Sequence, residues 1–294
     1  MRRATWGMAS VVVLLGLLGI GAGAGLRPDG GGEDSTPVRV VAAVPMPTYD
    51  HVVVVVLENK RYSQIVESKG YIKRLGDQGA EFTRSYAVTH PSQPNYVALF
   101  SGSTQGITDD SCPNTLTGPQ LARQLSRSGH TFGAYSEGLP ATGSRACSSP
   151  SGKYRRKHAP WTNFSSFNQT KHKPFGRFPT AFGKLPTVSF VVPNMCHDMH
   201  DCSIATGNLW MRRHLDPYAQ WAKTHNSLLV VTFDEDDDTA VNRIYTALIG
   251  AHVAPGDYDD VIDHYSLLRM LEDMYGLAHL GHAAQAPAIT GIWN

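Results

Sequence analysis

Short apolar runs alternate with amphipathic stretches along most of the chain. The runs at 51–57 and 227–233 are rich in Val and Leu, which is typical of strands buried on both faces of a parallel sheet. Three shorter runs predict further strands, at 131–135, 187–192 and 244–249. Four stretches have the spacing of helices, at 71–79, 120–127, 209–223 and 265–274. This alternation predicts a single α/β domain with a doubly wound, mainly parallel sheet and helices on both faces.

Two regions depart from this pattern. At the N-terminus, two arginines precede an apolar run, and an Ala-x-Ala cleavage motif follows, so residues 1–24 are interpreted as a secretory signal peptide. An uncleaved membrane anchor is the alternative. Residues 25–48, rich in Gly, Pro and Asp, predict a flexible leader before a catalytic domain at 49–294. Residues 138–184 have little periodicity and predict a loop-rich insertion over the sheet.

Composition and charge exclude some classes of protein. The 294 residues are 41% hydrophobic, which is enough to bury a substantial core. The formal net charge is only +1, so the chain as a whole has no electrostatic basis for binding nucleic acid. We expect a secreted or cell-envelope protein without a stable membrane anchor once the signal peptide is removed.

Four cysteines in an exported chain most simply form two disulfides. Three pairings are open, and pairing of neighbours gives Cys112–Cys147 and Cys196–Cys202. The second pair brackets a segment with two histidines and two aspartates, so a zinc site with thiolate ligands is the alternative. We predict disulfides because export leads to an oxidising compartment.

Polar side chains follow several of the predicted strands, where open α/β sheets bind their ligands. Glu58 and Asn59 follow the first strand, and an acidic run that begins at Asp234 follows the fourth. A segment rich in His and Asp at 197–201 follows the third strand, and His264 lies at the start of the last helix. Oxygen ligands mixed with imidazole suit Mg²⁺, Mn²⁺, Ca²⁺ or Zn²⁺. The sequence therefore predicts a divalent metal site.

A serine precedes another predicted helix. Pro94 is suited to the first position of a helix, which places Ser92 just ahead of the helix N-terminus. Backbone N–H groups there favour phosphate and an ionised hydroxyl, so Ser92 is a candidate nucleophile. The alternative is that Ser92 only caps the helix. The spacing alone does not decide between these two roles.

Five segments resemble a known family: Glu58-Asn59, His90–Tyr96, Pro193-Asn194 with Asp198–Asp201, Phe233–Asp237 and His264–Leu268. In this order they resemble the bacterial phosphoesterases, a family of acid phosphatases and phospholipase C-type enzymes with an alkaline-phosphatase-like fold. The resemblance spans about residues 48–294. It is strongest to the small secreted acid phosphatases of mycobacteria, which dephosphorylate phosphoinositides among other monoesters.

The resemblance implies a role for individual residues. Ser92 corresponds to the nucleophile, and Asn95 would bind phosphoryl oxygens. Lys157 and His158 match a segment near the substrate phosphate, so His158 is a candidate acid for the leaving group. The implied metal ligands are Glu58, Asn59, Asp234 and Glu235 on the nucleophile side, and Asp198, His200 and His264 on the opposite side.

Some positions depart from the family pattern. Asp201 is an alternative to one of the ligands on the opposite side, and His197 is assigned no role. Glu235 stands where the broader superfamily usually has histidine, so the number and identity of the metal ions stay open.

These observations predict a secreted acid phosphatase that hydrolyses phosphate monoesters, including membrane phosphoinositides. A phospholipase C that cleaves phosphodiesters is the main alternative, and a secreted protein that binds metal without catalysis is another. A serine esterase is disfavoured because no G-x-S-x-G motif is present. A sulfatase of the same fold is disfavoured because Cys112-Pro113-Asn114 lacks the Cys-x-Pro-x-Arg pattern.

Overall fold

The computed structural model describes residues 44–294. The predicted signal peptide and most of the predicted leader lie outside the described residues. Within the described part, no helix combines the length and the apolar character needed to cross a membrane.

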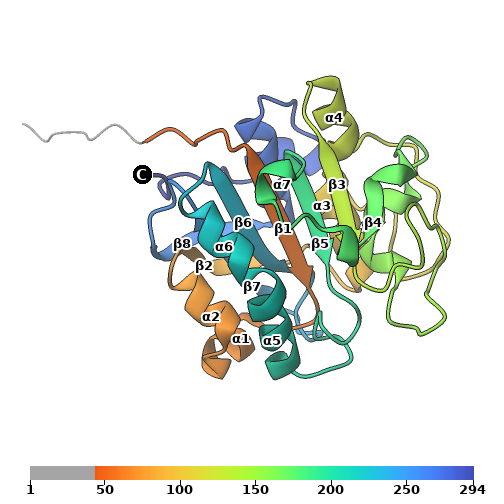
Figure 1. Cartoon of the computed structure of the whole chain (residues 1–294), viewed down its shortest axis with the longest axis horizontal. Helices are drawn as coiled ribbons and strands as arrows, with labels where there is room; N and C mark the ends of the chain where they lie inside the picture. Colours follow the sequence, from red (N-terminus) through yellow and green to blue (C-terminus); the bar gives the residue numbers. More distant parts are fainter. Residues whose placement is uncertain (1–43) are drawn as a thin grey trace, which may run out of the picture. The chain divides into compact units, whose positions relative to one another are not determined.

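A central eight-stranded sheet organises the domain (Figure 1). Its order is β4-β3-β5-β1-β6-β7-β2-β8, and β7 alone runs against its neighbours β6 and β2. The sheet is therefore mainly parallel, as predicted. The strands are β1 His51–Leu57, β2 Ala80–Tyr86, β3 Phe132–Ser136, β4 His172–Pro174, β5 Val188–Val192, β6 Ser227–Phe233, β7 Arg243–Gly250 and β8 Gly256–Asp263.

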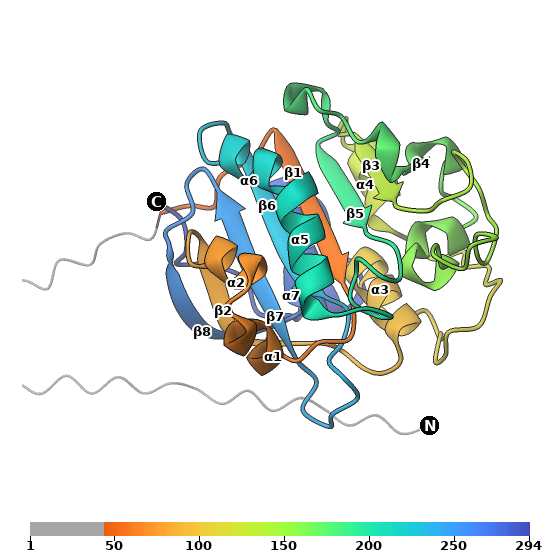
Figure 2. The same ribbon diagram turned by 60° about the horizontal axis from the view of Figure 1, so that its bottom comes forward.

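Helices cover both faces of the sheet, as Figure 2 shows for α5 and α7 on opposite sides. The helices are α1 Tyr62–Ser68, α2 Tyr71–Gly76, α3 Ser92–Ser101, α4 Leu121–Arg127, α5 Ile204–His214, α6 Asp216–Ala222 and α7 His264–Met274. Side chains alternate along β1, so Val52 and Val54 join the core under α3 and α7, whereas Val53 and Val55 join the core under α5 and α6. The valine-rich run is explained by burial on both faces.

The predicted helix at 209–223 is in fact two helices. The first ends at His214 and the second begins at Asp216, with Pro217 in its first turn. Proline has no N–H to donate to the preceding turn, which favours a new helix start over continuation.

Residues 138–184 contribute to the core as well as to the surface. This segment supplies β4 at the sheet edge, and its Trp161 and Phe164 are fully buried against Phe100 of α3. Its 3-10 helices are η1 Arg156–His158, η2 Pro160–Asn163, η3 Gln169–Lys171, η4 Phe175–Arg177 and η5 Phe182–Lys184; η6 Gly281–Ala284 follows α7.

Both predicted disulfides are present, and the described residues contain no free cysteine. Cys112–Cys147 joins the segment after α3 to the segment before η1. Cys196–Cys202 closes the loop after β5, so the alternative of a zinc–thiolate site is excluded.

Candidate active site

The carboxyl ends of β1, β5 and β6 bring three buried carboxylates together. Glu58 and Asp234 follow β1 and β6 directly, and Asp198 lies in the loop that Cys196–Cys202 closes. The backbone N–H of Glu58 donates to the Asp198 carbonyl at 2.8 Å, and that of Asp234 donates to Leu57 at 2.9 Å. These bonds hold the three segments in register.

Ser92 lies in this cluster as the first residue of α3. Its hydroxyl donates to Glu235 Oε1 at 2.9 Å and to Glu58 Oε2 at 3.2 Å, and the side chain is buried. The helix starts two residues earlier than predicted, with Pro91 at the N-cap and no side-chain cap. The hydroxyl of Ser92 therefore does not cap α3, and it faces two carboxylates that can accept its proton.

A histidine from η1 completes a group of three metal-type ligands. His158 Nε2 lies 3.1 Å from Glu58 Oε1, and its Nδ1 lies 3.5 Å from Asp198 Oδ2. One ligand atom from each of these residues lies within 4.8 Å of the others. The His158 ring also stacks on Tyr96 of α3, with centroids 5.2 Å apart. Packing thus fixes the imidazole between the two carboxylates.

The electrostatics of the cluster favour a bound cation. Burial raises the pKa of Glu58 well above its usual value, and the charge of Asp198 raises it further. Burial likewise raises the pKa of Asp234 and of Asp198. Oxygens of Asp198, Asp234 and Asn59 are buried without a hydrogen-bond partner. A divalent cation fits such a donor set because it would engage these oxygens and neutralise their repulsion.

The protonation state of His158 bears on its predicted role as an acid. Burial lowers its pKa well below the usual value, and the neighbouring positive charge of Lys157 lowers it further. At neutral pH the ring is uncharged, with a lone pair to offer. This suits a metal ligand better than a proton donor.

Other predicted residues lie around this centre in different roles. Asn59 donates from its side chain to Glu235 at 3.0 Å. His264 bonds the Phe233 carbonyl through Nε2 at 3.0 Å and leaves Nδ1 buried without a partner. His200 is one-third exposed and contacts Asp201, with its ring 6.2 Å from that of His158.

The side-chain amide of Asn95, predicted to bind phosphoryl oxygens, is engaged within the loop before α3. Its Oδ1 accepts from the N–H groups of Val88 and Thr89, and its Nδ2 donates to the carbonyls of Thr89 and Pro91. These four bonds occupy both ends of the amide, so Asn95 holds the loop before α3 and leaves no donor for phosphoryl oxygens.

Two contacts of the cluster were not predicted from the sequence. Tyr96 donates to Glu58 at 2.5 Å, and His90 Nδ1 lies 2.5 Å from Glu235 Oε2. Burial lowers the pKa of His90, but its hydrogen bonds to Glu235 and Thr239 and the nearby charges of Glu235 and Asp236 together outweigh this and raise the pKa above the ordinary value. Both residues lie in the His90–Tyr96 segment, whose resemblance to the family was the only signal.

The chain matches a known family and several known proteins over most of its length. The phosphoesterase family profile matches residues 67–278. Phosphatidylinositol-3-phosphatase from Mycobacterium tuberculosis is 50% identical over 265 residues, which cover 88% of each chain. A phosphate-repressible acid phosphatase from Penicillium chrysogenum is 31% identical over 83% of this chain, which spans 63% of that relative. Both names describe phosphoric monoester hydrolases, in agreement with the predicted enzyme class.

Solved structures agree on the fold. A protein of the alkaline phosphatase superfamily from Vibrio parahaemolyticus has a TM-score of 0.60 at 13% identity, covering 84% of this chain and 72% of its own. The lipoteichoic acid synthase LtaP from Listeria monocytogenes has a TM-score of 0.54 at 11% identity, covering 81% and 76%. The predicted alkaline-phosphatase-like fold is confirmed.

Proposed function

The chain belongs to the phosphoesterase family, and from this premise we propose that it is a secreted acid phosphatase acting on phosphate monoesters, phosphoinositides among them. The observation that carries the proposal is the contact of the Ser92 hydroxyl with two buried carboxylates beside the Glu58–His158–Asp198 group. A nucleophile, a proton acceptor and a cation site thus lie within one cluster.

In the proposed reaction, Ser92 Oγ attacks the phosphorus in line with the leaving group. The serine proton passes to Glu235 or Glu58, which lie 2.9 and 3.2 Å away, as the new O–P bond forms. The bond from phosphorus to the leaving oxygen breaks, and that oxygen takes a proton from water. Water then hydrolyses the phosphoserine, which releases inorganic phosphate and restores the hydroxyl.

Glu58, His158, Asp198 and Asp234 are the residues that we propose to hold a divalent cation, with Asn59 beside them. When bound, such an ion stabilises the negative charge of the transferring phosphoryl group. His90 orients Glu235 through its short hydrogen bond, and Tyr96 orients Glu58 in the same way. We assign His158 to the cation site and no longer to the leaving group.

Export is part of the proposal. We propose that residues 1–24 are a signal peptide and 25–48 a leader, because two disulfides need an oxidising compartment. The exported chain would then begin at residue 25, with the catalytic domain at 49–294.

The test is phosphate release from p-nitrophenyl phosphate, run beside bis-p-nitrophenyl phosphate and phosphatidylinositol 3-phosphate. We expect turnover of both monoesters, loss of turnover in EDTA and its recovery with one of Mg²⁺, Mn²⁺, Ca²⁺ or Zn²⁺. Turnover of the diester with little monoester activity would move the assignment to a phospholipase C. A folded protein that is inactive on all three substrates would overturn the assignment as an enzyme.

A further inference from the structure

A cavity of about 360 Å³ adjoins the proposed catalytic cluster. Lys157 and His200 line it, and these residues are direct neighbours of the cluster, since Lys157 precedes His158 and the His200 N–H donates to Asp198 at 2.8 Å. The Cys112–Cys147 disulfide and Met195 form further parts of the wall. Lys157 and His200 thus connect the cavity with the cluster, which makes the cavity a candidate space for the group attached to the reacting phosphate.

The charges in this cavity are unequal. Its acidic member, Asp110, is engaged twice, by Lys157 Nζ at 2.7 Å and by the backbone N–H of Gln93 at 2.9 Å. Its remaining cation, Arg155, is exposed, and none of the ion pairs found among the described residues involves it. A guanidinium without a carboxylate partner is a ready donor for a phosphate or carboxylate of a ligand.

We propose that Arg155 binds a second anionic group carried by the leaving group of the substrate. This inference rests on the proposed function, because it takes the reacting phosphate to lie at Ser92. The preferred substrates are then phosphate monoesters whose alcohol carries another phosphate. Phosphatidylinositol 3-phosphate has this chemistry, since its inositol ring carries a diester phosphate as well as the monoester.

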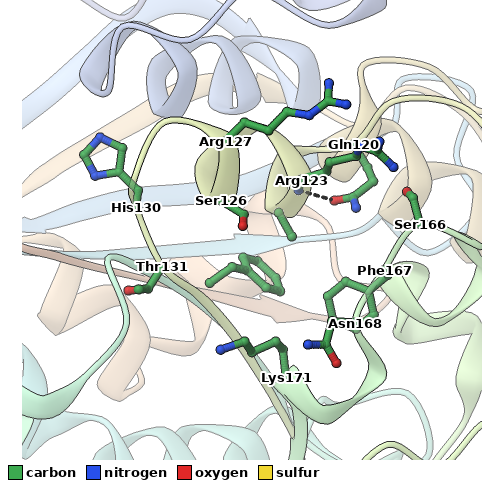
Figure 3. Close-up of a pocket in the computed structure, with 12 residues that line it drawn as sticks. Gln120, Arg123, Ser126, Arg127, His130, Thr131, Ser166, Phe167, Asn168 and Lys171 are labelled. Carbon is green, nitrogen blue, oxygen red and sulfur yellow. Dashed lines mark hydrogen bonds between the residues drawn. The ribbon is translucent and has the colours of Figure 1, made fainter.

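The domain offers a matched control at a different basic hollow (Figure 3). That cavity, also about 360 Å³, is lined by Arg123, Arg127, His130 and Lys171, and it lies by Phe132 at the start of β3. The catalytic cluster lies at the opposite, carboxyl ends of the strands. Arg127 is exposed like Arg155, so Arg127→Ala removes the same charge far from the reaction.

The kinetic test compares dioctanoyl phosphatidylinositol 3-phosphate with p-nitrophenyl phosphate, which has no second anion. For Arg155→Ala we expect kcat/KM to fall about tenfold further on the phosphoinositide than on p-nitrophenyl phosphate, chiefly through KM, because a hydrogen bond to a charged group is lost. Arg155→Lys should recover part of the difference. Arg127→Ala should match the wild type on both substrates. Equal losses on both substrates, or equal losses in the two alanine variants, would overturn the proposal.

A binding measurement separates this inference from the proposed function. Inositol 1,3-bisphosphate is titrated calorimetrically into Ser92→Ala, with and without Arg155→Ala, so that no turnover is needed. We expect the dissociation constant to rise about tenfold when Arg155 is replaced. An unchanged constant would refute the Arg155 site even if the enzyme is a phosphatase. A tenfold rise would support the site even if no substrate were hydrolysed.

Discussion

Two buried glutamates on the same sheet have opposite surroundings. Glu81, on β2, accepts hydrogen bonds from Tyr62 at 2.7 Å and Tyr245 at 2.9 Å, and it pairs with Lys73 at 2.9 Å. Glu58, at the end of β1, is equally buried, but it lies beside Asp198. Glu81 is matched by two hydroxyl donors and a cation, whereas Glu58 accepts from the uncharged hydroxyls of Tyr96 and Ser92 and is crowded by a second carboxylate.

The difference is the one expected between a carboxylate that holds the fold and one that, in the proposed function, serves the reaction. Tyr62, Tyr245 and Lys73 satisfy the buried oxygens of Glu81, so this residue contributes to stability through its contacts. The crowding of Glu58 with other carboxylates is unfavourable for the isolated chain and becomes favourable only with a cation.

The largest expected effect comes from exchanging the two glutamates for glutamine in turn. Glu58→Gln should lower kcat/KM by about 10³, because it removes a charge from the cation site and an acceptor of the Ser92 proton. In EDTA its free energy of unfolding should equal or exceed that of the wild type, since a repelled charge is gone.

Glu81→Gln should do the reverse. Activity should stay within a few-fold of the wild type, while the loss of the Lys73 pair lowers the free energy of unfolding by about 2 kcal/mol. Enzyme assays and urea unfolding of both variants measure whether activity falls in one variant and stability in the other. If both variants lost stability and activity to the same extent, the distinction between Glu58 and Glu81 would be wrong.

The next effect tests the assignment of His158. If His158 is a ligand, His158→Ala should weaken cation binding and lower turnover by about 10² on good and poor leaving groups alike. An acid would matter little for p-nitrophenyl phosphate and much for glycerol phosphate. Rates on both substrates, with metal binding by calorimetry, distinguish the roles. Normal metal affinity, with a loss of rate confined to glycerol phosphate, would instead support His158 as the acid for the leaving group.

The smallest effect concerns a third buried carboxylate, outside both clusters. Glu272 of α7 accepts only from the Leu280 N–H, at 2.9 Å, and burial raises its pKa to about 8. Because this folded pKa lies above the unfolded value, burying Glu272 costs no stability at low pH, where the carboxyl is protonated in both states. The free energy of unfolding then declines as the pH rises toward 8. Glu272→Gln removes this decline.

Unfolding in urea at pH 5 and pH 8 measures this effect. The gain of Glu272→Gln over the wild type should be small at pH 5 and on the order of 2 kcal/mol at pH 8. A gain that is the same at both pH values would contradict the titration of Glu272.

The strands with uniform apolar runs were predictable from the sequence. β1 and β6 have the predicted bounds because every residue between them packs on one face or the other. β2 and β8 were missed because Glu81, Arg84 and several aspartates interrupt their patterns. Edge position and specific partners allow those polar residues in a sheet, and a single sequence does not show such partners.

The residues of the site were likewise only partly predictable from the sequence. Residues that follow strands, such as Glu58 and Asp234, were placed by the rule that parallel strands end at one edge. Tyr96 was missed because its contact with Glu58 depends on how α3 docks on the sheet. Asn95 was assigned to phosphate by resemblance, and only the loop geometry shows that its amide is fully used.

The role of Ser92 as the nucleophile is tested by phosphate release from p-nitrophenyl phosphate by Ser92→Ala. Ser101→Ala, at the other end of α3, is the matched control because Ser101 Oγ only contacts carbonyl oxygens and Gln105. We expect Ser92→Ala to stay folded and to lose about 10³ or more in kcat, and Ser101→Ala to turn over normally. Ordinary turnover by a folded Ser92→Ala would refute Ser92 as the nucleophile.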